Sequence, residues 1–230
     1  MNNCFCVTFS VILLAIVSIH AKPWIAEPRT DARFQHLHKH YLNETAMNKD
    51  HEKAIFIGAS TVEKWNLNGK AIWNKHYAPR RAYNYGINGD RTEHVLWRIE
   101  NGEFNGLKAK LVVLLVGYNN LSHKDHPEDV AKGIHEIIKA IKSKIAHVKV
   151  LLANILPSGH HNSAIHATNK LLPKEADNKT VFHLDMTKHY ESSPGHINTT
   201  LFIEDKLHMT EAGYKVWYKA MEPLFAKLIA

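Results

Sequence analysis

Cysteine is scarce in this chain, and its placement limits the chemistry that the protein can use. The only two cysteines, Cys4 and Cys6, lie at the start of an amino-terminal segment that contains an apolar stretch. That stretch, residues 5–19, is short for a membrane-spanning helix, and Ala21 after it suits a cleavage site. We therefore expect residues 1–21 to be a secretory signal peptide rather than a membrane anchor. The mature chain would then have no disulfide and no thiol nucleophile, so its core alone must stabilise it.

Dense basic runs are also missing, although the chain as a whole is basic. The formal net charge is +7 with histidine neutral, but no run of lysine and arginine is interleaved with aromatic residues. This pattern does not indicate nucleic-acid binding. In a secreted protein the excess charge would favour anionic surfaces such as glycosaminoglycans or acidic lipids, although scattered surface charge is the simpler interpretation.

Low-complexity segments and internal repeats are absent as well, which indicates an ordinary globular protein. The length of 230 residues and the hydrophobic content of 45% suit one domain with a full core. We expect that domain to span residues 22–230.

Short apolar runs alternate along the chain with segments of helical character. Strands are expected at 54–57, 82–85, 111–116, 148–155 and 181–184. Helices are expected at 92–101, 127–144 and 210–228. Alternation of this kind is typical of an α/β fold, in which helices cover both faces of a parallel sheet.

Polar residues follow these strands, at the edge where ligands bind in such sheets. Ser60 follows the first strand, and Asp205 and His208 precede the last helix. A serine nucleophile needs a neutral imidazole to take its proton and a carboxylate to orient that imidazole. We expect these three side chains to meet, although a helix-capping serine, a capping aspartate and a surface histidine are the simpler alternatives.

Acyl transfer also requires donors for the oxyanion of the tetrahedral intermediate. Gly89 follows the second strand, and Asn119 follows the third. The N–H groups of Ser60 and Gly89 and the Asn119 side chain could donate to that oxygen. Alternatively, Gly89 is only a turn glycine and Asn119 only a loop residue.

Histidine is abundant, and some of it is clustered. His36, His38 and His40 alternate, and His160 and His161 are adjacent. On a helix His36 and His40 would share a face, as zinc ligands can. No acidic or cysteine partner completes a site, so we favour a polar helix face and expect no metal.

Four sequons are candidate glycosylation sites in a secreted protein. Their asparagines are Asn43, Asn120, Asn178 and Asn198. We do not expect a glycan on Asn120, because it lies within the proposed site.

Four blocks of the sequence together resemble the SGNH (GDSL-type) hydrolases. The blocks are Gly58-Ala59-Ser60, Gly89, Gly117-Tyr118-Asn119 and Asp205-Lys206-Leu207-His208. The similarity is greatest to the catalytic subunits of intracellular platelet-activating-factor acetylhydrolase, notably over residues 84–90 and 94–103. It extends from about Arg33 to the end of the chain.

The resemblance implies a three-layer α/β/α fold, flavodoxin-like, with a five-stranded parallel sheet. It implies ester hydrolysis without metal or organic cofactor, and a homodimer is an expectation on the same ground. By position it makes Ser60 the nucleophile, His208 the base and Asp205 its orienting acid. The oxyanion hole would comprise Ser60, Gly89 and Asn119.

Three positions depart from the family pattern. Ala59 replaces the usual aspartate before the serine, Tyr118 replaces a small threonine, and Thr61 replaces a hydrophobic residue. In the relatives the positions of Thr61, Tyr118 and Leu207 surround the acyl group. A bulky Tyr118 should shrink this pocket, so we expect short acyl groups, acetyl first.

The resulting hypothesis is a secreted serine esterase acting on short-chain esters, such as acetylated phospholipids resembling platelet-activating factor or acetylated glycans. The alternative is a weakened or inactive lipid- or glycan-binding protein on the same scaffold, which Ala59 and Tyr118 motivate.

Overall fold

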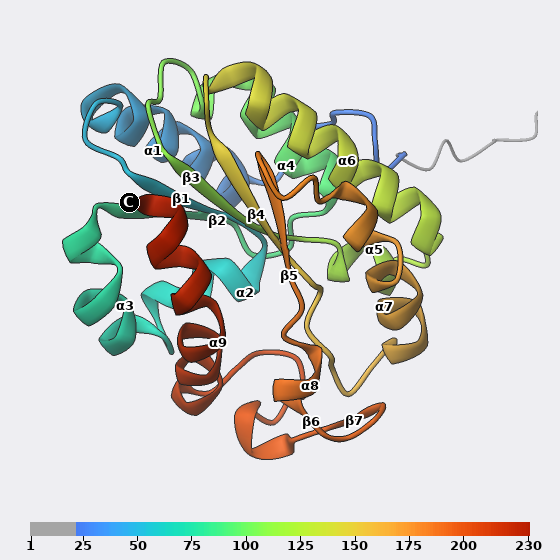
Figure 1. The fold of residues 1–230 in the computed structure, drawn as a ribbon. Coiled ribbons are helices and arrows are strands. Elements are labelled where there is room, and N and C mark those ends of the chain that lie inside the picture. The colour runs from blue at the N-terminus through green and yellow to red at the C-terminus, as the bar shows by residue number, and fades with distance from the viewer. Residues whose placement is uncertain (1–21) are drawn as a thin grey trace, which may run out of the picture.

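A five-stranded parallel sheet forms the centre of the molecule in the computed structural model, which describes residues 22–230 (Figure 1). The expected signal peptide, residues 1–21, lies outside this described part. The strands run in the order β2-β1-β3-β4-β5. Their bounds are Ala54–Gly58 for β1, Ala82–Gly86 for β2, Leu111–Leu115 for β3, Lys149–Ala153 for β4 and Val181–Leu184 for β5. The five-stranded parallel sheet expected from the sequence is confirmed.

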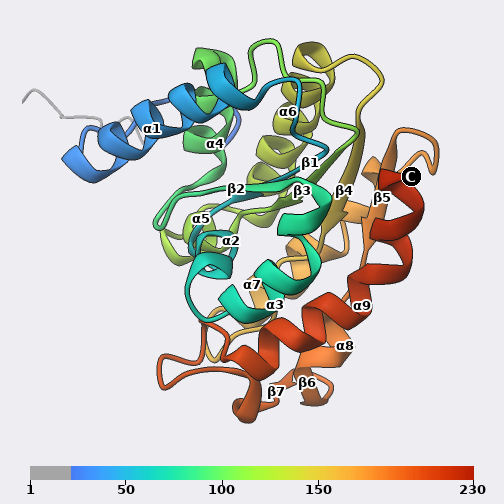
Figure 2. The same ribbon diagram turned by 90° about the vertical axis from the view of Figure 1, so that its left-hand side faces the viewer.

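Helices cover both faces of the sheet, so the molecule has three layers (Figures 1 and 2). One face carries α1 (Ala32–Asn48), α4 (Thr92–Arg98), α6 (Pro127–Lys144) and α7 (Asn162–Asn169). The other face carries α3 (Lys70–His76), α8 (Thr187–Tyr190) and α9 (Glu211–Ile229). Two short helices, α2 (Ser60–Glu63) and α5 (Tyr118–Ser122), begin just after β1 and β3. Between α8 and α9 the chain forms a small antiparallel pair, β6 (Glu191–Ser193) and β7 (His196–Ile197).

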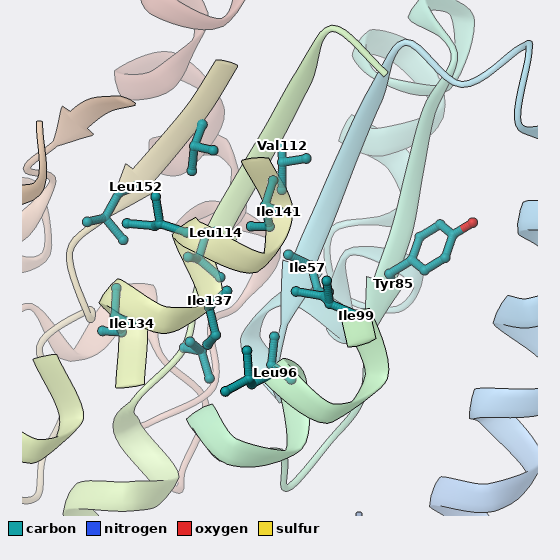
Figure 3. Close-up of a cluster of buried hydrophobic side chains, with 14 of the residues drawn as sticks. Ile57, Tyr85, Leu96, Ile99, Val112, Leu114, Ile134, Ile137, Ile141 and Leu152 are labelled. Carbon is teal, nitrogen blue, oxygen red and sulfur yellow. The ribbon is translucent and has the colours of Figure 1, made fainter. Parts of the chain in front are cut away.

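The first face is packed with aliphatic side chains, because the strands are apolar on both faces and α6 repeats isoleucine at helical spacing. Figure 3 shows side chains of α4 and α6 against side chains of the sheet. The labelled ones are Ile57, Tyr85, Val112, Leu114 and Leu152 from the strands, and Leu96, Ile99, Ile134, Ile137 and Ile141 from the helices and the turn after α4.

The second face is largely aromatic. Trp65 and Trp217 are fully buried with ring centroids 5.3 Å apart. Phe56 of β1 contacts Phe225 of α9 at 5.9 Å. Close contacts between large rings bury much apolar area per residue, so this layer fixes α9 against the sheet.

Two predicted helices agree with the structure, and a third is shorter than predicted. Helix α6 has the predicted bounds, and Thr210 caps α9 by accepting from the N–H of Gly213 at 3.3 Å. Helix α4 ends at Arg98 and is followed by a π-helical turn, Ile99–Glu103, in which Asn101 and Gly102 leave helical geometry, with a φ of +112° at Gly102. No helix within residues 22–230 is both long and apolar enough to cross a membrane.

Candidate active site

Ser60 lies where the central strand β1 turns into α2. Strand β1 is paired on both sides, with β2 and β3, so its carboxyl end is in the middle of the sheet edge. The turn begins at Gly58, where a Cβ atom would come within 2.0 Å of the Leu115 carbonyl oxygen and φ is +157°. Only glycine allows the two backbones to approach so closely. The turn places Ser60 on the first turn of α2, and only 6% of the residue is exposed.

His208 and Asp205 reach Ser60 from the loop before α9. His208 Nε2 lies 2.8 Å from Ser60 Oγ, and His208 Nδ1 lies 2.5 Å from Asp205 Oδ2. The other carboxylate oxygen, Oδ1, accepts from the N–H groups of Leu207 at 2.9 Å and His208 at 2.8 Å. The structure therefore brings together the three side chains that the sequence pattern linked.

The hydrogen bonds of this loop decide which imidazole nitrogen carries the proton. Burial alone raises the pKa of the Asp205 carboxyl, but bonds from the His208 backbone and side chain and from the Leu207 N–H outweigh it and lower the pKa. An ionised Asp205 only accepts hydrogen bonds, so His208 Nδ1 must be the donor. Nε2 is then an acceptor facing the Ser60 hydroxyl, and this arrangement can remove the hydroxyl proton.

Gly89 lies on the loop after β2, and Asn119 lies in α5, just after β3. Gly89 has a φ of +86°, which strongly favours glycine. Asn119 donates one hydrogen of Nδ2 to the Asp90 carbonyl oxygen at 2.7 Å. An amide has two hydrogens on this nitrogen, so one remains for another acceptor. The Ser60 N–H, at the start of α2, has no acceptor within its helix.

The expected acyl-pocket residues adjoin these groups. Thr61 follows Ser60 in α2 and is half-buried, and its carbonyl accepts from the Tyr214 hydroxyl at 2.7 Å. Tyr118 is the first residue of α5 and contacts His161 edge-on at 6.0 Å. Burial raises the pKa of the Tyr118 phenol, and the Ser158 side chain opposes the shift. Leu207 is half-buried between Asp205 and His208.

A buried ionic network supports the Gly89 loop, and sequence reasoning did not find it. Arg98 is fully buried, and donates to Asp90 Oδ2 at 2.9 Å and to Glu103 Oε2 at 2.5 Å. Glu103 Oε1 also contacts His38 Nδ1 at 2.7 Å. The sequence did contain a signal for this network: Asp90, Arg98 and Glu103 are charged residues in or near α4 at positions that face the core.

The histidine-rich segment forms part of α1. His38 is buried against Glu103. His36 and His40 are exposed. Among residues 22–230 no group of three or more histidine, cysteine, aspartate or glutamate side chains could hold a metal ion.

The match to a family model decides the identity of this scaffold. Residues 56–216 match the model of the GDSL-like Lipase/Acylhydrolase family. The chain belongs to this family. It is therefore an ester hydrolase of the GDSL type.

Known relatives of this GDSL hydrolase agree in sequence and in fold. It is 31% identical over 212 residues to platelet-activating factor acetylhydrolase IB subunit alpha1 of Rattus norvegicus, covering 90% of this chain and 88% of that one. It is 32% identical over 208 residues to subunit alpha2 of the same organism, covering 86% of each. A GDSL-like lipase from Bacteroides thetaiotaomicron has the same fold, with a TM-score of 0.70 and 18% identity over 83% of this chain and 97% of that one.

Proposed function

We propose that this GDSL hydrolase is a serine esterase that removes short acyl groups, acetyl first, through Ser60, His208 and Asp205. The observation that carries the proposal is the continuous pair of contacts from Ser60 Oγ to His208 Nε2 and from His208 Nδ1 to Asp205. Both contacts have hydrogen-bond length, so one proton can leave the hydroxyl without movement of the loop.

The reaction follows from these positions. Ser60 Oγ attacks the ester carbonyl carbon while His208 Nε2 takes the hydroxyl proton, and Asp205 stabilises the imidazolium that forms. The carbonyl oxygen becomes an oxyanion, to which the N–H groups of Ser60 and Gly89 and the free Nδ2 hydrogen of Asn119 donate. His208 then returns the proton to the departing alcohol oxygen. Water, deprotonated by the same imidazole, then attacks the acyl carbon. The bond from that carbon to Ser60 Oγ breaks, His208 returns the proton to Oγ, and the carboxylic acid leaves.

The acyl group is proposed to be small because the family resemblance assigns Tyr118, the first residue of α5, to the positions that surround the acyl group. The alpha1 and alpha2 relatives are named acetylhydrolase subunits, which supports acetyl as the group removed. An acetylated phospholipid resembling platelet-activating factor, or an acetylated glycan, would supply such an ester.

Replacing Tyr118 with threonine should widen the acyl pocket. We expect kcat/KM for butyryl relative to acetyl p-nitrophenyl ester to rise by about 10-fold or more in Tyr118→Thr, since each methylene accommodated in an apolar pocket changes discrimination by this order. Steady-state kinetics on acetyl, butyryl and octanoyl esters measure the ratio. Tyr218→Thr, a half-buried tyrosine on α9 stacked on His76, is the control and should leave the ratio unchanged. An unchanged ratio in Tyr118→Thr would remove this residue from the acyl pocket.

A binding protein on the same scaffold is the second candidate, and the replacement of the usual aspartate by Ala59 favours it. Ala59 precedes α2 without a side-chain hydrogen bond to the helix, so Ser60 lacks that support. Absence of turnover by the wild-type protein across the ester panel, with retained binding of an acetylated lipid or glycan, would favour this candidate over the esterase.

Export is the remaining part of the proposal, and it rests on the apolar stretch at residues 5–19 and on Ala21. We expect protein expressed in a secretory host to reach the medium with Lys22 as its first residue. Amino-terminal sequencing or intact-mass measurement checks this. Asn120 should carry no glycan there, because it is fully buried and donates to Glu93 and Asp125. Retention in the cell with residues 1–21 still attached would contradict export.

A further inference from the structure

Arg29 contacts the loop that carries Gly89 from a segment well before it in the chain. Its Nη1 donates to the Asn88 carbonyl oxygen at 2.7 Å and to Asp90 Oδ1 at 3.2 Å. A Cβ atom on Gly89 would lie 3.0 Å from the same nitrogen. The guanidinium therefore packs directly against the backbone of Gly89, with contacts on both sides of it.

The Asn88 carbonyl and the Gly89 N–H belong to one peptide unit. That unit is planar and trans, so its C=O and N–H point in opposite directions. A bond that fixes the carbonyl direction therefore also fixes the direction of the N–H. Because the donor is a cation, it also polarises the amide and makes the N–H a stronger donor.

The surrounding contacts leave this peptide little freedom. The N–H of Asn88, in the preceding unit, donates to Glu63 Oε2. The carbonyl of Asp90, in the following turn, accepts from Asn119 Nδ2. Two of the three proposed donors to the oxyanion, the Gly89 N–H and the Asn119 side chain, are thus oriented by contacts that involve residues 88–90.

Arg29 is itself held in place. Its Nε donates to Asp31 Oδ2 at 2.8 Å, and Asp31 Oδ1 caps α1 by accepting from the Phe34 N–H at 3.0 Å. Gln35 Nε2 donates back to the Arg29 carbonyl at 2.6 Å. The start of α1 therefore anchors the guanidinium, although this segment precedes residues 56–216, which match the family model.

We propose that Arg29 is a positioning residue for ester hydrolysis, which orients and polarises the Gly89 N–H through the Asn88 peptide. The inference rests on the proposed serine-esterase function. A rival role is direct binding of substrate, because Arg29, Gly89 and Arg91 also line an open hollow of about 430 Å³. The two roles differ in which kinetic constant they change.

The test compares Arg29→Met and Arg29→Lys with the wild-type enzyme on p-nitrophenyl acetate. Loss of one oxyanion donor reduces kcat by 10²–10³-fold, so a donor that is present but poorly aimed should cost about 10–100-fold. We expect this loss in kcat for Arg29→Met with KM within about threefold of wild type. Arg29→Lys should recover part of kcat, since an ammonium can reach one acceptor but lacks the planar fork.

Arg80→Met is the matched control, because Arg80 is also a part-buried arginine paired with a carboxylate, that of Glu222, but it contacts α9 rather than the Gly89 loop. Its kcat should equal that of wild type. A wild-type kcat in Arg29→Met would overturn the proposal, and so would a rise in KM with kcat unchanged. If Arg29→Met fails to fold, an unchanged kcat in Arg29→Lys overturns it equally. Failure of the proposed function itself would appear differently, as a wild-type protein without turnover.

Discussion

Ser60→Ala should abolish hydrolysis of p-nitrophenyl acetate, with kcat falling on the order of 10⁴-fold or more, toward the uncatalysed background. The reason is that the hydroxyl is both the attacking atom and the partner of His208 Nε2, and members of such a unit fail together. His208→Ala should cause a loss of similar size, because within residues 22–230 no other group is bonded to the Ser60 hydroxyl to take its proton. Spectrophotometric rates on purified variants measure both.

A covalent probe separates loss of the nucleophile from loss of the fold. An organophosphonate should add its phosphonyl group to the Ser60 peptide of the wild type, as read by mass spectrometry, and should leave Ser60→Ala unmodified. Ser192→Ala, an exposed serine on β6, is the control and should keep both turnover and labelling. Wild-type turnover in Ser60→Ala, or labelling of a different residue in the wild type, would contradict the proposed mechanism.

The sheet edge that carries the candidate site could be predicted from the sequence because the topology of a parallel sheet determines it. Continuous apolar runs such as 111–116 indicate strands covered on both faces, and parallel strands end at one edge of the sheet. Residues directly after β1, β2 and β3 must then be neighbours, whatever the details of the loops. The loop before α9 was found from its Asp205 and His208 spacing together with the family resemblance, since the sheet alone does not place it.

Helix α1 shows where sequence patterns were too weak. Its buried residues, including Phe34, His38 and Tyr41, do follow helical spacing, but histidine and threonine replace the aliphatic residues that make α6 obvious. The available start signal was Asp31, whose side chain caps the helix. The sequence analysis considered a helix only around the histidine cluster, and it did not predict the start of α1, which anchors Arg29.

The supporting contacts of the Gly89 loop could not be derived from periodicity. They join residues far apart in the chain, such as Arg29 with Asn88, and they depend on side-chain directions that only the packed structure fixes. A charged residue in an apolar helix face predicts that some partner exists, but not which one. Sequence patterns therefore indicated the candidate reacting groups but not the groups that hold them.

Arg98→Met should destabilise the fold strongly, by about 3–5 kcal/mol. The variant keeps an unbranched side chain of similar length but leaves Asp90 and Glu103, both fully buried, without their shared cation. Thermal unfolding should show a Tm lower by roughly 6–20 °C, given the usual shift for a domain of this size. Lys139→Met is the control, because its pair with Glu136 is exposed and should contribute about 1 kcal/mol or less. A Tm close to wild type in Arg98→Met would mean that Arg29 and His38 suffice to compensate the two carboxylates, and that the network is not what holds the Gly89 loop.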